Sequence, residues 1–182
     1  MTINHFLIAV EHFHEVFTNL IRAAELRLRA AAPGSLPLVL IGKKGRDQIS
    51  RTYRSDVVHG IEPGDLGKLG FEEVQGWAAD LTARFDAGEF DVAHLFFSKF
   101  VSVLTQEPTE IQLMPVAVAE TGAAPATVGA SVEYEPDEEE ILADLLPRNV
   151  SVQLLRAQRE NAASEQGSKM TAMDNATRNA GD

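Results

Sequence analysis

The sequence of 182 residues predicts a layered α/β domain with a mainly parallel sheet, followed by a long helix at the C-terminus. Two observations carry this prediction. Short apolar runs typical of buried strands alternate with segments whose apolar residues recur at helical spacing. Residues 148–180 contain one glycine and no proline, so an uninterrupted helix there would extend for roughly 50 Å. We therefore expect a globular α/β domain over residues 1–136 and a helical segment over 137–182.

The first third of the chain is predicted to alternate strand and helix. The apolar runs at 6–10 and 36–41 predict two buried strands, and the valines at 57 and 58 predict a third, brief one. Between the first two strands, residues 16–31 carry apolar side chains at helical spacing. Residues 47–53 predict a short helix. Such alternation favours a mainly parallel sheet.

The middle of the chain adds a loop, a helix and two strands. Residues 60–70 are rich in glycine and predict a loop. A helix is predicted over 71–87, where five apolar residues share one face: Val74, Trp77, Ala78, Leu81 and Phe85. Residues 91–97 predict a strand, with an expected continuation over 99–104 past a bulge, and residues 111–118 predict another strand.

The C-terminal segment begins with acidic residues, which favour the positive end of a helix. Pro147 is expected to interrupt this helix, either as a kink or as the first residue of a new helix. Farther on, the side chains are small, which lets another helix approach closely, and Met170 and Met173 tolerate irregular contacts. The pattern is typical of contact with a polar, adaptable neighbouring helix, although a solvated terminal helix fits it equally well.

The net charge of −11 limits the classes of partner. Such a balance repels nucleic acids and anionic lipids, so binding to either is not expected. No cysteine is present, which excludes disulfides and cysteine metal sites. The longest apolar runs, at 36–41 and 92–97, fall far short of the roughly 20 residues that a membrane-spanning helix needs. Basic residues gather between 22 and 54 and acidic ones between 133 and 144, as two solvated faces or as a dipolar docking surface.

Three motifs offer chemistry but are explained better by plain structure. His12 and His14 would share one face of a strand, as zinc ligands can, yet no further residue has ligand spacing. The GKKG turn at 42–45 lacks the spacing of a phosphate-binding loop, and no dinucleotide-binding glycine fingerprint occurs. The glutamates at 138–140 fit an acidic helix start. We therefore expect no catalytic, cofactor-binding or metal-binding residue.

The tail carries the most specific motif of the chain: SEQ at 164–166, MTAM at 170–173, NAT at 175–177 and NAG at 179–181. This run resembles the start of the C-terminal shaft helix in the gamma subunits of rotary F-type ATP synthases. Other segments resemble the same family in the same order: TNLIR at 18–22, IGKKG at 41–45, AGEFD at 87–91, FFSKF at 96–100, QEPT at 106–109 and QLMP at 112–115. The resemblance covers roughly residues 18–182.

The resemblance implies a Rossmann-like domain and a partial coiled-coil shaft. In that family the gamma subunit is a non-catalytic central-stalk rotor, without a cofactor, that couples proton-driven rotation to ATP synthesis in the catalytic subunits. The implied partners are the alpha and beta subunits, the epsilon subunit and the c-subunit ring. The implied location is peripheral, at the cytoplasmic face of the bacterial inner membrane. Partner-contact residues are then expected in the tail: Ser164, Glu165, Met170, Met173, Asn175, Arg178 and Asn179.

The sequence also departs from the family pattern. The chain begins almost at the first strand, residues 11–16 replace a glycine-rich turn, Lys169 stands where arginine is usual, and the helix stops at Asp182. We therefore expect a fragment, a truncated gene product or a shortened relative. Two rival functions stay open. One is a Rossmann-like nucleotide-binding enzyme, which the layered fold favours and the absent glycine fingerprint opposes. The other is a regulatory binding paralogue that uses the tail helix.

Overall fold

The computed structural model describes residues 5–10, 26, 37–42, 54, 57–62, 69–116 and 138–181. In chain order, the elements are β1 (His5–Val10), β2 (Leu38–Ile41), β3 (Val57–Ile61), α3 (Phe71–Asp86), β4 (Val92–Ser102), β5 (Thr105–Met114) and α4 (Glu138–Gly181). Apart from residue 26, the helices predicted over 16–31 and 47–53 lie outside the described residues, as does the pair His12 and His14.

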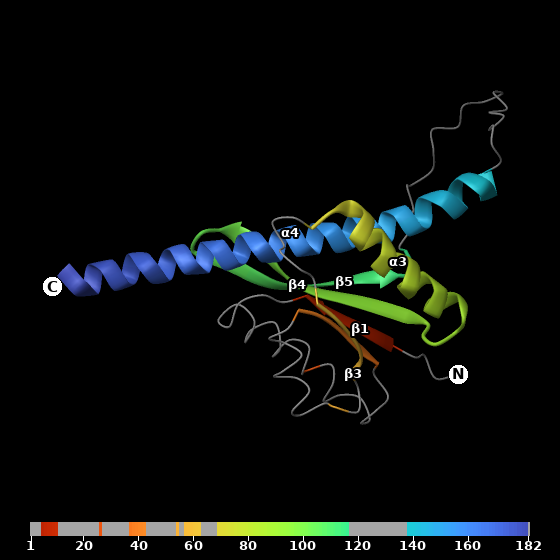
Figure 1. The fold of residues 1–182 in the computed structure, drawn as a ribbon, viewed down its shortest axis with the longest axis horizontal. Coiled ribbons are helices and arrows are strands. Elements are labelled where there is room, and N and C mark those ends of the chain that lie inside the picture. The colour runs from red at the N-terminus through yellow and green to blue at the C-terminus, as the bar shows by residue number, and fades with distance from the viewer. Residues whose placement is uncertain are drawn as a thin grey trace, which may run out of the picture.

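The five strands form one sheet in the order β3-β2-β1-β4-β5 (Figure 1). β1 pairs in parallel with β2 and with β4, and β2 pairs in parallel with β3. β5 runs antiparallel to β4 and follows it through a short turn, which is the connection that antiparallel neighbours permit. The prediction of a mainly parallel sheet within an α/β fold is confirmed.

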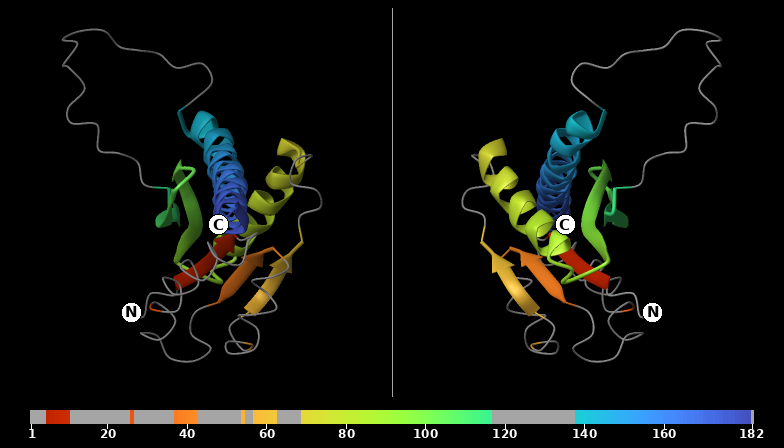
Figure 2. Two further views of the ribbon diagram at one scale, coloured as in Figure 1. Left: turned by 90° about the vertical axis from the view of Figure 1, so that its left-hand side faces the viewer. Right: turned by 90° about the vertical axis from the view of Figure 1, so that its right-hand side faces the viewer.

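One face of the sheet is covered by α3 and α4, which lie side by side (Figure 2). The core between these helices and the sheet includes strand residues from β1, β2 and β4: Phe6, Ile8, Val39, Ile41, Ala93, Leu95 and Phe97. The alternate strand residues Leu7, Leu38 and Leu40 are buried as well. Strands that are apolar on both faces read as continuous apolar runs, which explains why β1 and β2 were predictable.

The prediction of α3 is confirmed within one residue at its end. Its buried residues recur at helical spacing: Val74, Ala78 and Leu81. The helix stops at Gly88, which has a φ of 72°. Glycine adopts such a positive φ at little cost because it has no Cβ. The N–H groups of Gly88 and Glu89 donate to the carbonyls of Phe85 and Arg84 at 2.9 and 3.1 Å. These two bonds form the helix ending in which a left-handed glycine satisfies the last carbonyls.

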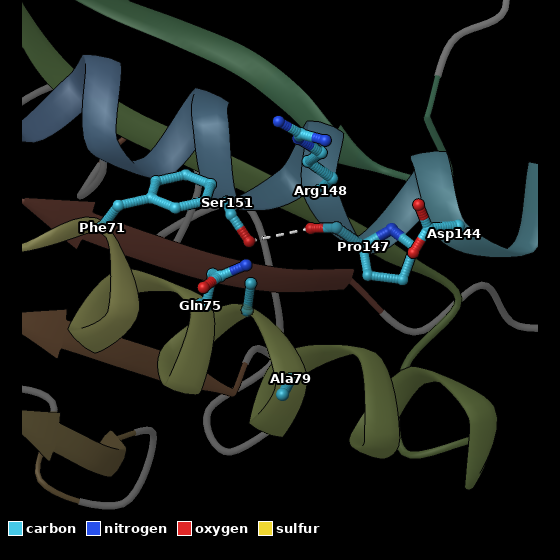
Figure 3. Close-up of a pocket in the computed structure, with 8 residues that line it drawn as sticks. Phe71, Gln75, Ala79, Asp144, Pro147, Arg148 and Ser151 are labelled. Atoms are coloured by element: carbon cyan, nitrogen blue, oxygen red, sulfur yellow. Dashed lines mark hydrogen bonds between the residues drawn. The ribbon is translucent and has the colours of Figure 1, made fainter.

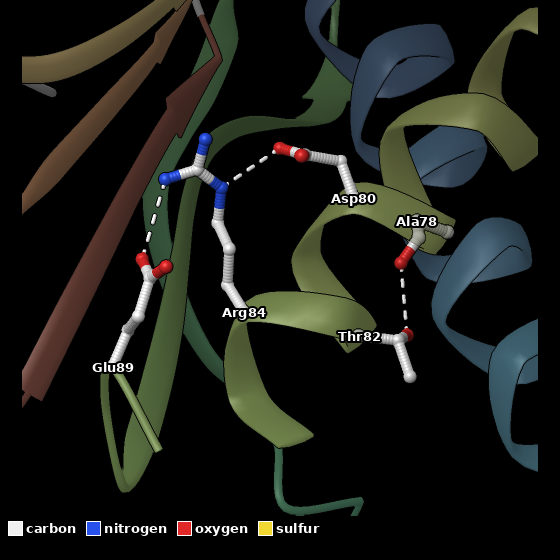
Figure 4. A network of polar contacts seen from close by, with 5 residues as sticks. All are labelled: Ala78, Asp80, Thr82, Arg84 and Glu89. Carbon is white, nitrogen blue, oxygen red and sulfur yellow. Dashed lines mark hydrogen bonds and ion pairs between the residues drawn. The ribbon is translucent and has the colours of Figure 1, made fainter. Parts of the chain in front are cut away.

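Arg84 ties the last turn of α3 to the loop that leads into β4 (Figure 4). Its guanidinium donates to Asp80 at 3.0 Å and to Glu89 at 3.3 Å. The hydrogen bond to Asp80 is the main reason why the pKa of Arg84 lies above its ordinary value. Because both carboxylates are about half exposed, each pair contributes little to stability, on the order of 0.5 kcal/mol.

Two strands are longer than the sequence predicted. β3 extends to Ile61 and so enters the loop predicted to begin at residue 60. β5 begins at Thr105, well before the predicted start at 111. Its first half carries mostly exposed polar side chains because β5 is an edge strand, and an apolar run is therefore missing. Pro108, which cannot donate a ladder hydrogen bond, is tolerated on such an edge.

Of the two alternatives predicted at Pro147, the start of a new helix is wrong. α4 is a single helix from Glu138 to Gly181, and Pro147 lies inside it (Figure 1). A proline in a helix interior removes one backbone hydrogen bond and costs about 3 kcal/mol. From Val150 onward, α4 buries one side against α3 and the sheet, and this packing stabilises the helix through the proline.

We expect opposite effects from two glycine-to-alanine replacements. Gly88→Ala places a Cβ on a residue with positive φ and should lower the free energy of unfolding by about 1–2 kcal/mol. Gly76→Ala lies in the interior of α3, where an added Cβ meets no atom within 4 Å, and should raise it by about 0.5–1 kcal/mol. Urea unfolding followed by circular dichroism measures both changes. Shifts in the same direction would contradict the role of Gly88 as the helix stop.

Candidate interaction surface

β4 is longer than its parallel neighbour β1, and this leaves part of its edge without a strand. The pairing with β1 ends at Phe96, opposite Ala9. The pairing with β5 continues to Ser102, opposite Thr105. Among the described residues, the edge of β4 that faces β1 therefore has no strand partner beyond Phe96. Backbone groups in such a buried position need other hydrogen-bond partners.

Side chains of α4 supply those partners. The N–H of Ser98 donates to Asn161 Oδ1 at 3.2 Å, and the N–H of Phe100 donates to Glu160 Oε2 at 2.9 Å. The hydroxyl of Ser164 donates to the carbonyl oxygen of Ser98 at 3.0 Å. Asn161 and Ser164 are buried, so these bonds also explain why polar residues occur on the packed side of the helix.

The turn of the β4–β5 hairpin is held against the next two turns of α4. Thr171 Oγ1 lies 3.1 Å from the carbonyl oxygens of both Val103 and Gly167, which share its one proton, and Ser168 Oγ donates to Gln106 Oε1 at 3.2 Å. The helix comes so close at Gly167 that an added Cβ would lie 3.1 Å from Phe100 Cε2 and 3.4 Å from Val103 Cα. A Cβ at this crossing would require the Phe100 side chain to shift by a few tenths of an ångström, and a larger side chain would also crowd Val103.

Beyond Thr171 the helix leaves its own domain, as the left half of Figure 1 shows. Every residue from 172 to 180 is exposed. Five exposed apolar residues lie around the hairpin turn and the emerging helix, and we call them the hairpin–helix patch: Val101, Val103, Leu104, Met170 and Met173. Leu104 is 80% exposed and Met173 is 64% exposed, so both side chains are open to contact with a second protein.

Of the seven residues predicted to contact partners, two are buried or half-buried and five are exposed. Ser164 is 0% exposed and hydrogen-bonded to β4, so its hydroxyl contributes to the fold of this chain, and a contact with a partner stays a prediction. Glu165 is half-buried and pairs with Lys169 at 2.7 Å. The other five are exposed and remain predictions: Met170, Met173, Asn175, Arg178 and Asn179.

The polar half of the buried stripe on α4 was not predicted from the sequence. Buried apolar residues recur at Val150, Leu154 and Ala157, and the same spacing continues through Asn161, Ser164 and Ser168. Continuing the helical spacing past Ala157 would have found these residues, since the positions continue the same side of the helix. Because these side chains are polar, they indicate hydrogen-bonding groups opposite the helix and not an apolar core.

A second feature is a groove of about 550 Å³ between α3 and the beginning of α4 (Figure 3). Its lining mixes apolar and polar residues: Phe71, Gln75, Ala78, Ala79, Asp144, Pro147, Arg148 and Ser151. Asp144 and Arg148 lie one turn apart on α4, and Ser151 Oγ donates to the carbonyl oxygen of Pro147 at 2.9 Å. The groove offers recognition contacts from one carboxylate, one guanidinium and one amide.

In the described part of the chain, no group of three or more His, Asp or Glu residues could hold a metal ion. None of the helices in that part combines the length and the apolar character needed to traverse a bilayer.

The chain is similar to proteins of one kind. A family model described as ATP synthase matches residues 15–182. An ATP synthase gamma chain of Rhizorhabdus wittichii is 55% identical over 168 residues, covering 91% of this chain and 57% of the relative. One of Methylobacterium sp. (strain 4-46) is 48% identical over 170 residues, covering 93% of this chain and 58% of the relative. The chain therefore spans less than two thirds of the length of these curated relatives.

Solved structures share the fold at low sequence identity. A chain in the central stalk and c-ring of the Tetrahymena thermophila mitochondrial ATP synthase superposes with a TM-score of 0.73 and 16% identity, covering 96% of this chain and 76% of that chain. A chain in the rotor of the Euglena gracilis mitochondrial ATP synthase gives 0.67 and 14%, covering 97% and 67%. At such identities the match concerns the fold, including a sheet domain followed by a long helix.

We expect Gly167→Leu to separate the hairpin turn from α4, because the added side chain has no room against Phe100 and Val103. The free energy of unfolding should fall by about 1–3 kcal/mol. Amide hydrogen exchange at residues 102–105 should become faster. Ala172→Leu, at an exposed position one turn farther on, is the matched control and should change neither quantity. Equal effects of the two substitutions would refute the close crossing at Gly167.

Proposed function

We propose a function from a plain premise: this chain belongs to the ATP synthase gamma family. It acts as a central-stalk component, in which a globular base carries a helical shaft, and it couples rotation of the stalk to ATP synthesis in catalytic subunits. It has no catalytic residues of its own in this role. The chain changes the conformations of its partners by contacting their states unequally, which is how one protein shifts equilibria in another.

A single observation supports the shaft role most directly. α4 is anchored to its own sheet as far as Thr171, and its residues from 172 to 180 are exposed. A stalk needs both properties, because force passes to a partner only through a surface that is held firmly by its base. The division of the chain into a globular part over 1–136 and a shaft segment over 137–182 belongs to this proposal. The anchored stretch supports placing the working surface of the shaft after residue 171.

The proposed partners follow from the same premise. The alpha and beta subunits surround the shaft, and the epsilon subunit and the c-subunit ring contact the globular part. A solved structure with the same fold is described as a central stalk with its c-ring. The complex places the chain peripherally at the cytoplasmic face of the bacterial inner membrane. Within the shaft, the exposed residues Met170, Met173, Asn175, Arg178 and Asn179 are the proposed contacts.

Capture of an alpha–beta subcomplex by the immobilised full chain tests the proposal. We expect binding that weakens by roughly tenfold or more in the double variant Met170→Glu/Met173→Glu, because a carboxylate replaces each exposed apolar contact. Val152→Glu is the matched control: Val152 is also an exposed apolar residue of α4, but it lies well before residue 171, after which the proposed working surface of the shaft begins. Failure of the unaltered chain to bind, or equal weakening by the control, would count against the shaft role.

The rival nucleotide-binding enzyme makes a different prediction. Calorimetric titration of the isolated chain with ATP, and separately with NAD, should give no saturable heat if the chain is a stalk component. Saturable binding of either nucleotide by the isolated chain would favour the enzyme instead.

A further inference from the structure

We infer that Glu160, Asn161 and Ser164 are positioning residues that fix where α4 lies along β4 and how its exposed end is rotated. These three residues, with their bonds to the backbone of Ser98 and Phe100, are called the edge clamp below. The inference concerns the isolated chain. Its consequence for a rotating stalk rests on the proposed function.

The polarity of α4 matches the pairing of the sheet strand that it covers. Along its buried side, α4 is mostly apolar up to Ala157, as at Val150 and Leu154, although Ser151 and Gln158 are buried there too, and its buried side chains from Asn161 onward are polar. The sheet changes at the same place, because the pairing of β1 with β4 ends at Phe96 and the bonds to α4 begin at Ser98. The apolar half of the stripe therefore meets the apolar core, and the polar half meets the open edge of β4.

The apolar and polar halves of the buried stripe constrain α4 differently. Apolar contact is non-directional, so by itself it tolerates small shifts of a helix over a sheet. Hydrogen bonds to three particular backbone atoms are directional and end abruptly when the geometry is lost. A slip of one turn would move α4 by about 5.4 Å and carry Asn161 into the place of Ala157, a fully buried core residue. The amide would be buried without a partner there, and the N–H groups of β4 would lose theirs.

The position of the exposed end of α4 depends on the anchored part of the same helix. Residues 172–180 are all exposed, so no packing of their own sets where they lie. Asn175 lies about 21 Å along the helix from Asn161. A helix rotates by about 100° per residue, so a shift of one residue would turn a different side chain toward a partner. The edge clamp therefore decides which residues the shaft presents.

A distance measurement between two spin labels tests the clamp in the full chain. The sequence has no cysteine, so nitroxide labels attach at Glu73→Cys on α3 and Asn175→Cys on α4, both exposed positions. We expect one narrow distance distribution in the otherwise unaltered chain. The clamp variant Asn161→Ala/Ser164→Ala should broaden the distribution or add a population displaced by about 5 Å, the length of one helical turn.

Two further variants separate positioning from stability. Leu154→Ala removes buried apolar contacts of the same helix and should lower the thermal midpoint at least as far as the clamp variant does, yet keep the narrow distribution. Glu160→Gln keeps an acceptor oxygen for the N–H of Phe100 and should also leave the distribution narrow. If the double clamp variant does not fold, Asn161→Ala and Ser164→Ala are measured singly under the same criteria.

An unchanged distribution in a folded clamp variant would overturn the inference. Equal broadening in Leu154→Ala would overturn it as well, because lost stability alone would then loosen the helix. Neither result bears on whether the chain is a stalk component, since no partner is present in the measurement. Conversely, failure to capture alpha and beta subunits would remove the proposed function and leave the clamp intact.

Discussion

The edge of β4 beyond Phe96 is the constraint to which the rest of the structure adapts. Its backbone groups have no strand neighbour on that side among the described residues, and Ser98 is buried, so hydrogen bonds must come from elsewhere. α4 provides them through side chains, which requires the helix to turn from apolar to polar where β1 stops. Once that match is made, the hairpin lies along α4, and the direction in which the helix leaves the domain is set.

How much of this could be predicted depends on whether an element leaves a local pattern. β1, β2 and α3 bury apolar side chains, and burial produces runs or helical spacing that can be read directly. The first half of β5 was missed because an edge strand is held by backbone bonds to β4, which any residue with an N–H can make. The alternative of a new helix at Pro147 was wrong for the opposite reason: the local effect of a proline is strong, yet the packing of α4 from Val150 onward outweighs it.

The candidate surface shows the same limit at the level of function. The tail was recognisable from its motifs, but those motifs do not separate Ser164, which bonds to its own sheet, from Asn175, which is exposed. Both are small polar residues on the same helix. What distinguishes them is the length of the β4–β5 hairpin, whose turn meets the helix at Thr171. That boundary is a tertiary fact, since it depends on two segments more than 60 residues apart in the chain.

The exposed end of α4 can remain helical without a partner because its helix is already nucleated. An isolated helix of its length would be marginal, since forming the first turn is the unfavourable step. Here that turn is formed within the anchored part, and each further residue adds a hydrogen bond at modest entropic cost. Local features support the extension: the ion pair between Arg178 and Asp174 at 2.7 Å, and three alanines of high helix propensity at 172, 176 and 180. A partner therefore meets a preformed helix and does not have to order it, which leaves more of the contact energy for binding. The edge clamp thus contributes to recognition of a partner at the exposed end of α4, because one continuous, rigid helix connects the two sites.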